Sequence, residues 1–282
     1  MHRSIAQKLP AILSRRMGIL AAPSPGSFTF EPLFALLAVA ALVLYFRAAR
    51  SDRPPVLMMA SFVIGVGLIG VSLNSPLETL AVNYLLLAHL AQNALIADIA
   101  PPLVLLGLTG AMWSRCSAVI PRPLHVFAQP MVALPIWLVT WYGVHLAGIY
   151  DAAVSHPEWL NLEHAVLIGA GFAFWSPVVG TRWGGRSPVG LVPYLIVAFV
   201  AVSFLGLGLT FIPHPFYPYY THTPRLLGMS PTEDQNLGGV VMTAEQSLVY
   251  LAGIAALLLI LANREQQRVE AAQRDAPLPN SE

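Results

Sequence analysis

The stretch TLAVNYLLLAHLAQNALIADIAPPLVLLG, residues 79–107, decides the fold of this 282-residue chain. Its length and apolar character suit a helix that crosses the hydrocarbon core of a membrane, which takes about 20 residues. Two ionisable side chains, His89 and Asp98, nevertheless lie inside it. An acidic side chain at the centre of a membrane helix costs about 3 kcal/mol on insertion scales, so it usually faces the bundle interior and has a function. The stretch therefore predicts a membrane helix that carries part of a site.

The polar residues of this stretch follow a helical pattern. Gln92 and Asn93 lie three and four positions after His89, so all three share one face of a helix. The pair Pro101-Pro102 removes two backbone donors and should kink the helix or end it just before the pair. A second, tilted half could then follow, which leaves six or eight membrane crossings open beside seven.

Composition places the whole chain in a membrane. Hydrophobic residues make up 56% of it and charged residues only 10%, against about 25% charged in soluble domains. We expect an all-α, polytopic membrane helix bundle with about seven transmembrane helices. The expected spans are Phe30–Phe46, Pro55–Leu73, Thr79–Gly107, Met131–Leu146, Leu162–Val179, Val189–Phe211 and Leu237–Ala262.

Two tails flank the expected membrane domain, which would occupy residues 30–262. Apolar residues from Ile5 to Leu20 recur at helical spacing in the N-terminal tail, residues 1–29. They predict an interfacial amphipathic helix. The C-terminal tail, residues 263–282, is rich in Gln, Glu and Arg and should be solvated.

Basic residues give the expected orientation, because short cytoplasmic loops are rich in Lys and Arg. Those after the first, third, fifth and seventh spans are Arg47, Arg50, Arg53, Arg115, Arg122, Arg182, Arg186, Arg264, Arg268 and Arg274. The alternate loops contain only Arg225 and should face outward. The net charge of +1 comes from scattered residues, so we expect no nucleic-acid partner.

Candidate metal ligands gather at the outward ends of the expected helices. They are His89, His145, Asp151, His156, Glu163, His164, Asp234 and Met242. Four of them fall between residues 151 and 164 with no basic residue among them, a pattern that would attract and coordinate a cation. Imidazole suits Zn, Cu, Fe and Ni. The single cysteine, Cys116, excludes a Cys-x-x-Cys copper site within one chain.

Plainer interpretations exist for several of these polar residues. A histidine such as His89 can cap a neighbouring helix through one hydrogen bond, and Asp98 could pair with an arginine or support a ligand. Three loop tyrosines, Tyr217, Tyr219 and Tyr220, are most simply an aromatic belt at the membrane interface. A zinc protease is disfavoured because the chain lacks His-Glu-x-x-His. We expect no enzymatic activity.

Several blocks of the chain resemble the CtaG-type cytochrome c oxidase assembly factors. That family reads His-Met-x-Gln-His and then Ala-Pro-Pro-Leu-Leu-x-Leu-Gly, where this chain has HLAQN at residues 89–93 and APPLVLLG at residues 100–107. The resemblance continues in YDAAVSHP at 150–157, LEH at 162–164, FW at 174–175 and SPTEDQNLGGVVM at 230–242. Asn93 replaces a histidine of the family and Asp98 an apolar residue.

The resemblance implies a function and a location. It implies a multi-pass protein of the bacterial inner membrane that helps to mature a haem-copper oxidase. Its partners would be the lipid bilayer and subunits of the cytochrome c oxidase, and all eight candidate ligands lie at family positions. We therefore expect an assembly factor that binds copper at an outward-facing His/carboxylate site, on the periplasmic side, and delivers it.

Two other function classes stay open from the sequence. Histidines on neighbouring helices could be axial ligands of a b-type haem, or line a quinone site, in a membrane electron carrier. Asp98 in mid-span, followed by the proline pair, would also suit a proton-linked transporter.

Overall fold

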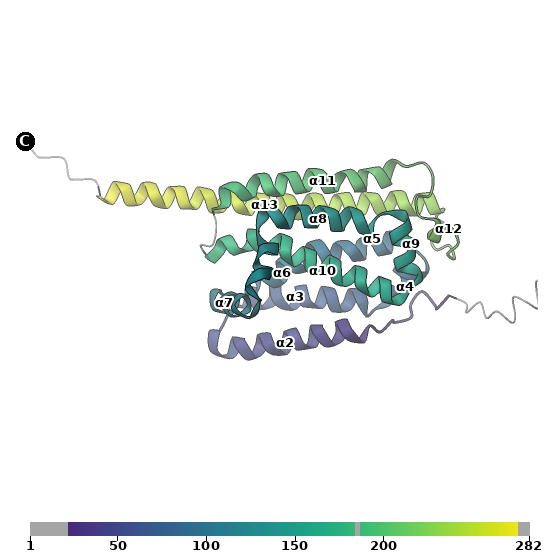
Figure 1. Cartoon of the computed structure of the whole chain (residues 1–282), viewed down its shortest axis with the longest axis horizontal. Coiled ribbons are helices and arrows are strands. Elements are labelled where there is room, and N and C mark those ends of the chain that lie inside the picture. Colours follow the sequence, from purple (N-terminus) through teal and green to yellow (C-terminus); the bar gives the residue numbers. More distant parts are fainter. Residues whose placement is uncertain (1–21, 184–186, 276–282) are drawn as a thin grey trace, which may run out of the picture.

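The computed structural model describes residues 22–183 and 187–275. All regular structure in these two segments is helical, and the long helices lie side by side in one bundle (Figure 1). Six helical segments are long and apolar enough to cross a membrane, and a bent pair makes a seventh if it is counted as one span. The prediction of an all-α membrane bundle is confirmed. The amphipathic helix expected between Ile5 and Leu20 lies outside the described residues.

Most of the long helices follow the hydropathy pattern. They are α2 (Pro32–Asp52), α3 (Val56–Leu73), α10 (Pro157–Val179), α11 (Leu191–Phe211) and α13 (Pro231–Asp275). The expected fourth span is the short helix α8 (Pro130–Val144), which follows the 3₁₀ helix η3 (Arg122–Ala128) at an angle of 71°. If the bent pair is counted as one span, it makes the seventh crossing.

The most buried span lies at the centre of the bundle. It consists of α5 (Leu86–Ala94), the π-helical segment η2 (Leu95–Ile99) and α6 (Ala100–Leu106). Of its residues 67% are buried, against 11% for α2. It packs against α3, α10 and α13, so its polar side chains face protein rather than lipid.

The proline pair does not end this helix, so that of the two expected outcomes, a kink or an end, the end is wrong. The helix widens into a π turn just before Pro101 and then continues to Leu106. Ala100 donates its N–H to the carbonyl of Leu95, five residues back. Such π turns are rare and frequently occur at functional sites.

The central span instead breaks before α5. Helix α4 (Pro76–Asn83) begins after Ser75, whose side chain accepts the N–H of Leu77, and it ends at Tyr84. Thr79, taken as the start of the span, lies within this separate helix. The sequence Ser75-Pro-Leu-Glu78 has the form of a capping box, which marks a helix start.

Helix α13 also begins earlier than its hydropathy predicts. Ser230 and Glu233 form a reciprocal cap: the Ser230 N–H donates to Glu233 at 2.7 Å, and the Glu233 N–H donates to the Ser230 hydroxyl at 3.2 Å. The helix therefore starts at Pro231 rather than at Leu237. This brings Asp234 into its first turn.

The short helices lie at the two ends of the bundle. At one end lie α4, α9 (Ala147–Ser155) and α12 (Pro218–Thr221); at the other lie α7 (Gly110–Val119), η4 (Gly180–Trp183) and η5 (Pro188–Gly190) (Figure 1). Helix α13 extends beyond the α7 end, where residues 265–274 are exposed.

Candidate metal centre

Four of the eight predicted ligands come together in one buried cluster near the α4, α9 and α12 end. His89 comes from α5, His145 caps the C-terminus of α8, and Glu163 and His164 lie in the second turn of α10. Their exposed fractions are 0, 2, 5 and 0%. We call these four residues the histidine cluster.

Tyr150 lies among the rings of this cluster. Its ring centroid is 4.8 Å from that of His89 and 5.9 Å from that of His145. The rings of His89 and His164 are 6.1 Å apart. Residues that are far apart in sequence thus share one buried space because α5, α8, α9 and α10 meet there.

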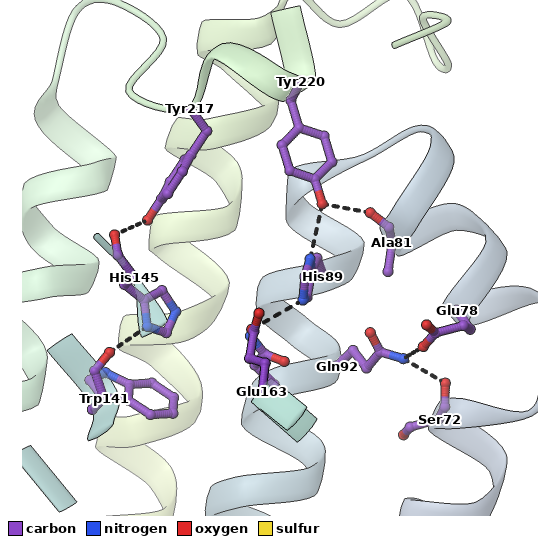
Figure 2. Close-up of polar contacts among 11 residues, drawn as sticks. Ser72, Glu78, Ala81, His89, Gln92, Trp141, His145, Glu163, Tyr217 and Tyr220 are labelled. Carbon is purple, nitrogen blue, oxygen red and sulfur yellow. Dashed lines mark hydrogen bonds and ion pairs between the residues drawn. The ribbon is translucent and has the colours of Figure 1, made fainter. Parts of the chain in front are cut away.

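His89 is held in one tautomer. Its Nδ1 lies 3.0 Å from the hydroxyl of Tyr220, and that hydroxyl donates its proton to the carbonyl of Ala81 at 2.6 Å (Figure 2). Tyr220 therefore accepts a hydrogen bond, so Nδ1 of His89 carries the proton. The opposite nitrogen, Nε2, lies 3.4 Å from Oε1 of Glu163.

His145 has the same arrangement. Its Nδ1 lies 2.6 Å from the carbonyl of Trp141, one turn earlier in α8, and can only donate to it (Figure 2). Its Nε2 is buried and has no hydrogen-bond partner. Metal-binding histidines typically tie one ring N–H to a carbonyl or similar acceptor and present the other nitrogen to the metal.

The carboxylate of Glu163 is only partly satisfied. Oε1 accepts the side-chain N–H of Asn93 at 2.9 Å, whereas Oε2 is buried without a partner. Asn93 thus supports the carboxylate through its side-chain amide. Both ring nitrogens of His164 are also buried and unpartnered.

The histidine cluster contains several buried polar atoms that have no hydrogen-bond partner. They include Nε2 of His89, Nε2 of His145, both nitrogens of His164 and Oε2 of Glu163. Burying polar atoms without partners costs free energy, and most such atoms in native proteins are satisfied by protein, water or a bound group. Among the described residues, however, no three His, Cys, Asp or Glu side chains are arranged to hold a metal ion as they stand.

Of the other four predicted ligands, Asp234, Asp151 and His156 have polar contacts of their own. Asp234 accepts the N–H groups of Leu86 and Leu87 at 2.9 and 3.0 Å and so caps α5 from a neighbouring helix. Asp151 accepts the N–H of Tyr219 at 3.2 Å.

His156 and Met242 complete this second group. His156 is exposed at the N-cap of α10, with Nδ1 3.2 Å from the carbonyl of Ala152. Met242 lies on α13 and is fully buried in the hydrophobic core of the bundle. The geometry therefore favours four of the eight candidates as ligands of a single ion.

For two of the three loop tyrosines, Tyr217 and Tyr220, the interpretation as an aromatic belt is wrong. Tyr217 and Tyr220 are only 1 and 2% exposed. Tyr217 donates to the carbonyl of His145 at 3.0 Å, and Tyr220 holds His89. Tyrosines at an interface and tyrosines that insert into a bundle have the same composition, so only the fold separates them.

Glu78 and Gln92 form a second polar contact beside the cluster. Gln92 donates to the Glu78 carboxylate and, at 2.7 Å, to the carbonyl of Ser72 (Figure 2). Burial raises the pKa of Glu78 to about 7 from an ordinary value of 4.5, against the lowering effect of the Gln92 hydrogen bond. The folded chain thus keeps a proton that the unfolded chain releases at lower pH.

We expect this proton to make stability depend on pH. Between pH 4.5 and about 7 the folded state binds more protons at Glu78 than the unfolded state, so the free energy of unfolding falls as pH rises and levels off above that window. The fall is at most about 3 kcal/mol. The Glu78→Gln variant should lose this slope when thermal unfolding is followed across the window, whereas Glu158→Gln at an exposed site should keep it. Equal slopes in both variants would contradict the assignment.

Fold and site together define a polytopic membrane protein with a buried His/carboxylate cluster at one end of its bundle. The chain belongs to the cytochrome c oxidase caa3 assembly factor family (Caa3_CtaG), whose family model matches residues 39–264. No curated protein and no solved structure matches it. The chain is thus a member of a family of oxidase assembly factors, in agreement with the resemblance seen in its sequence. That it is not an enzyme stays a prediction.

Proposed function

We propose that this assembly factor binds copper at the histidine cluster and supplies it to a haem-copper cytochrome c oxidase. The observation that carries the proposal is the pair His89 and His145. In each ring a hydrogen bond holds the proton on Nδ1 and leaves the Nε2 lone pair free in a buried space. Two such nitrogens beside a carboxylate are a donor set that suits copper.

The separation of two donors supports a shared ion. Nε2 of His89 lies 3.4 Å from the carboxylate of Glu163, a distance that fits an ion pair if His89 is doubly protonated and a shared cation if it is neutral. Two electron-rich atoms stay this close only with a cation between them or a proton on one of them. Donors that share an ion at bond lengths of about 2 Å lie about 3 Å apart, which fits the observed distance.

An incomplete ligand set suits a copper ion that is bound transiently and passed on, rather than one that is held permanently. Structural metal sites are closed by four ligands, whereas sites that exchange a ligand keep a position open. Cu(I) accepts low coordination numbers, so His89 and Glu163 with His164 or His145 would be enough to hold it. Small rotations of the unpartnered His164 ring would then add or remove a ligand during transfer.

Charge distribution supports an outward-facing site. Arg50, Arg53, Arg115 and Arg182 all belong to the α7 end of the bundle or to the loops beside it. By the positive-inside rule that end faces the cytoplasm, and the histidine cluster lies at the opposite end. Copper taken from the periplasm would reach the cluster without crossing the membrane core.

A complementation experiment tests the proposed delivery. In cells that lack this chain, wild type should restore oxidase activity and the copper content of the purified oxidase. The His89→Ala/His164→Ala double variant should leave oxidase copper at least 10-fold lower, as expected when ligands rather than supporting residues are lost. His125→Ala, at an exposed site near the α7 end, should behave as wild type. Full restoration by the double variant, at equal membrane abundance, would overturn the proposal.

A further inference from the structure

A second polar group lies deeper in the bundle, away from the histidine cluster. Asp98 is fully buried on η2, and its Oδ1 accepts the hydroxyl proton of Tyr250 at 3.1 Å. Tyr250 in turn accepts the indole N–H of Trp137 at 2.9 Å. Oδ2 of Asp98 has no partner. In the part of the chain that the structure describes, neither Asp98 nor Glu245 forms an ion pair with an arginine or lysine.

Helix α13 adds two further polar side chains to this place. Glu245 lies on α13 five residues before Tyr250, the hydrogen-bond partner of Asp98, and both of its carboxyl oxygens are buried without a partner. Gln246 is fully buried, and neither its amide oxygen nor its amide nitrogen has a partner. It lies one turn before Tyr250 on the same helix face, which is the face that packs on η2.

The depth of this group matters for its charge. Asp98 lies twelve residues after Leu86, or about 18 Å along the helix at 1.5 Å per residue, in a hydrocarbon core about 30 Å thick. Two buried carboxylates in this part of the bundle are strongly unfavourable when both are charged, because each charge is costly alone and the two repel. One proton removes the repulsion.

We propose that Asp98 and Glu245 form a proton-binding site in the membrane interior that holds a single proton at neutral pH. The proton lies on Glu245, whose oxygens receive no hydrogen bond. The negative charge lies on Asp98, which Tyr250 stabilises by donating its hydroxyl proton. Gln246 offers an unused donor and acceptor beside the pair.

No other titratable group competes for this proton nearby. The helices packed against η2 are α3, α5, α6, α10 and α13. Of these, α3 and α6 contain no titratable side chain, α5 contains only His89, and α10 contains Glu158, Glu163 and His164 near its N-terminus. Helix α13 contains, besides Glu245 and the hydrogen-bond donor Tyr250, only Glu233 and Asp234 in its first turn and the charged residues from Arg264 onward. His89 is nine residues from Asp98, about 14 Å along the helix. The proton site is therefore separate from the proposed copper site and does not depend on it.

The π turn gives the site a feature that suits proton exchange. Asp98 lies on the π-helical segment itself, directly before the proline pair, where backbone hydrogen bonds are already rearranged. π turns recur at functional sites. This segment could open the buried pair to water without unfolding the span.

Infrared spectroscopy of the purified protein tests the proposal, because a protonated carboxyl group has its own C=O stretching band. At neutral pH, the difference spectrum between wild type and Glu245→Gln should contain a band from one buried acid that shifts in D₂O. Asp98→Asn should keep the band, since Glu245 stays protonated. Tyr250→Phe should strengthen it, because Asp98 loses its donor and takes up a second proton. Glu265→Gln, at an exposed site on α13, serves as the control.

Several results would overturn this assignment. If Glu245→Gln does not fold, the Asp98→Asn and Tyr250→Phe spectra still decide. Loss of the band in Asp98→Asn would move the proton to the other carboxyl and refute its proposed position. A difference spectrum without an acid band would remove the proton site altogether. Loss of the band on addition of sodium chloride would identify a metal-cation site in its place.

Discussion

We expect the Gly171→Ala variant to be destabilised by about 3 kcal/mol or more, in the upper part of the range for overpacked cores. Gly171 lies in α10 where this helix crosses the central span. A methyl group there would collide with the backbone carbonyl of Ala97 and come within 2.9 Å of Cγ of Pro101. The backbone of η2 cannot withdraw, because it is held on the other side by α3 and α13. Small residues permit such close contact between membrane helices.

A matched control lies two residues away on the same helix. A methyl group at Gly169 would meet no atom within 4 Å, so Gly169→Ala should keep or gain up to about 1 kcal/mol from the better helix propensity of alanine. Thermal unfolding in detergent, followed by circular dichroism, compares the two variants. Equal stability of both would mean that α10 and η2 are not packed as closely as described.

Loss of copper binding is the second large effect that we expect. Copper affinity should fall in His89→Ala and His164→Ala by more than the about 10- to 100-fold that loss of a supporting hydrogen-bond partner costs. Tyr220→Phe removes the acceptor that fixes the His89 tautomer and the hydrogen bond to Ala81, but no proposed ligand, so its loss of affinity should lie within that smaller range. Titration of the purified protein with Cu(I) against a competing chelator measures all three.

His125→Ala is the control for these titrations. His125 is exposed, and its Nε2 lies 3.1 Å from the carbonyls of Ser117 and Ile120, far along the chain from the cluster. It should bind copper as wild type does. If all three histidine variants bound copper equally, the site would have to be elsewhere.

The positions of the membrane helices were predictable, because a span needs a long apolar run and this chain has few charges. The predicted helix boundaries were wrong where a capping side chain, rather than hydropathy, sets the start of a helix. Ser75 and Ser230 each begin a helix through a serine cap that the apolar run alone does not contain. The expectation that the proline pair could end the helix comes from regular α-helices. Here the segment before Pro101 is π-helical, so the hydrogen bonds that a proline would disrupt are already rearranged.

The site was predictable only as a list of residues. Hydropathy and the positive-inside rule place all eight candidates near one face of the membrane, but they give no rotation for a helix. That rotation brings His89 toward Glu163 and turns Asp234 to cap α5 instead. Glu245 was missed because it lies in the last span beside residues that read as core, and its neighbour Asp98 is more than a hundred residues away.

The central claim is that the histidine cluster holds copper, and the X-ray absorption spectrum of the copper-loaded protein at the copper edge tests it most directly. The account predicts nitrogen and oxygen neighbours with the scattering pattern of imidazole, and a clear loss of that pattern in His89→Ala. A spectrum dominated by sulfur neighbours, or one that is unchanged in His89→Ala, would contradict it.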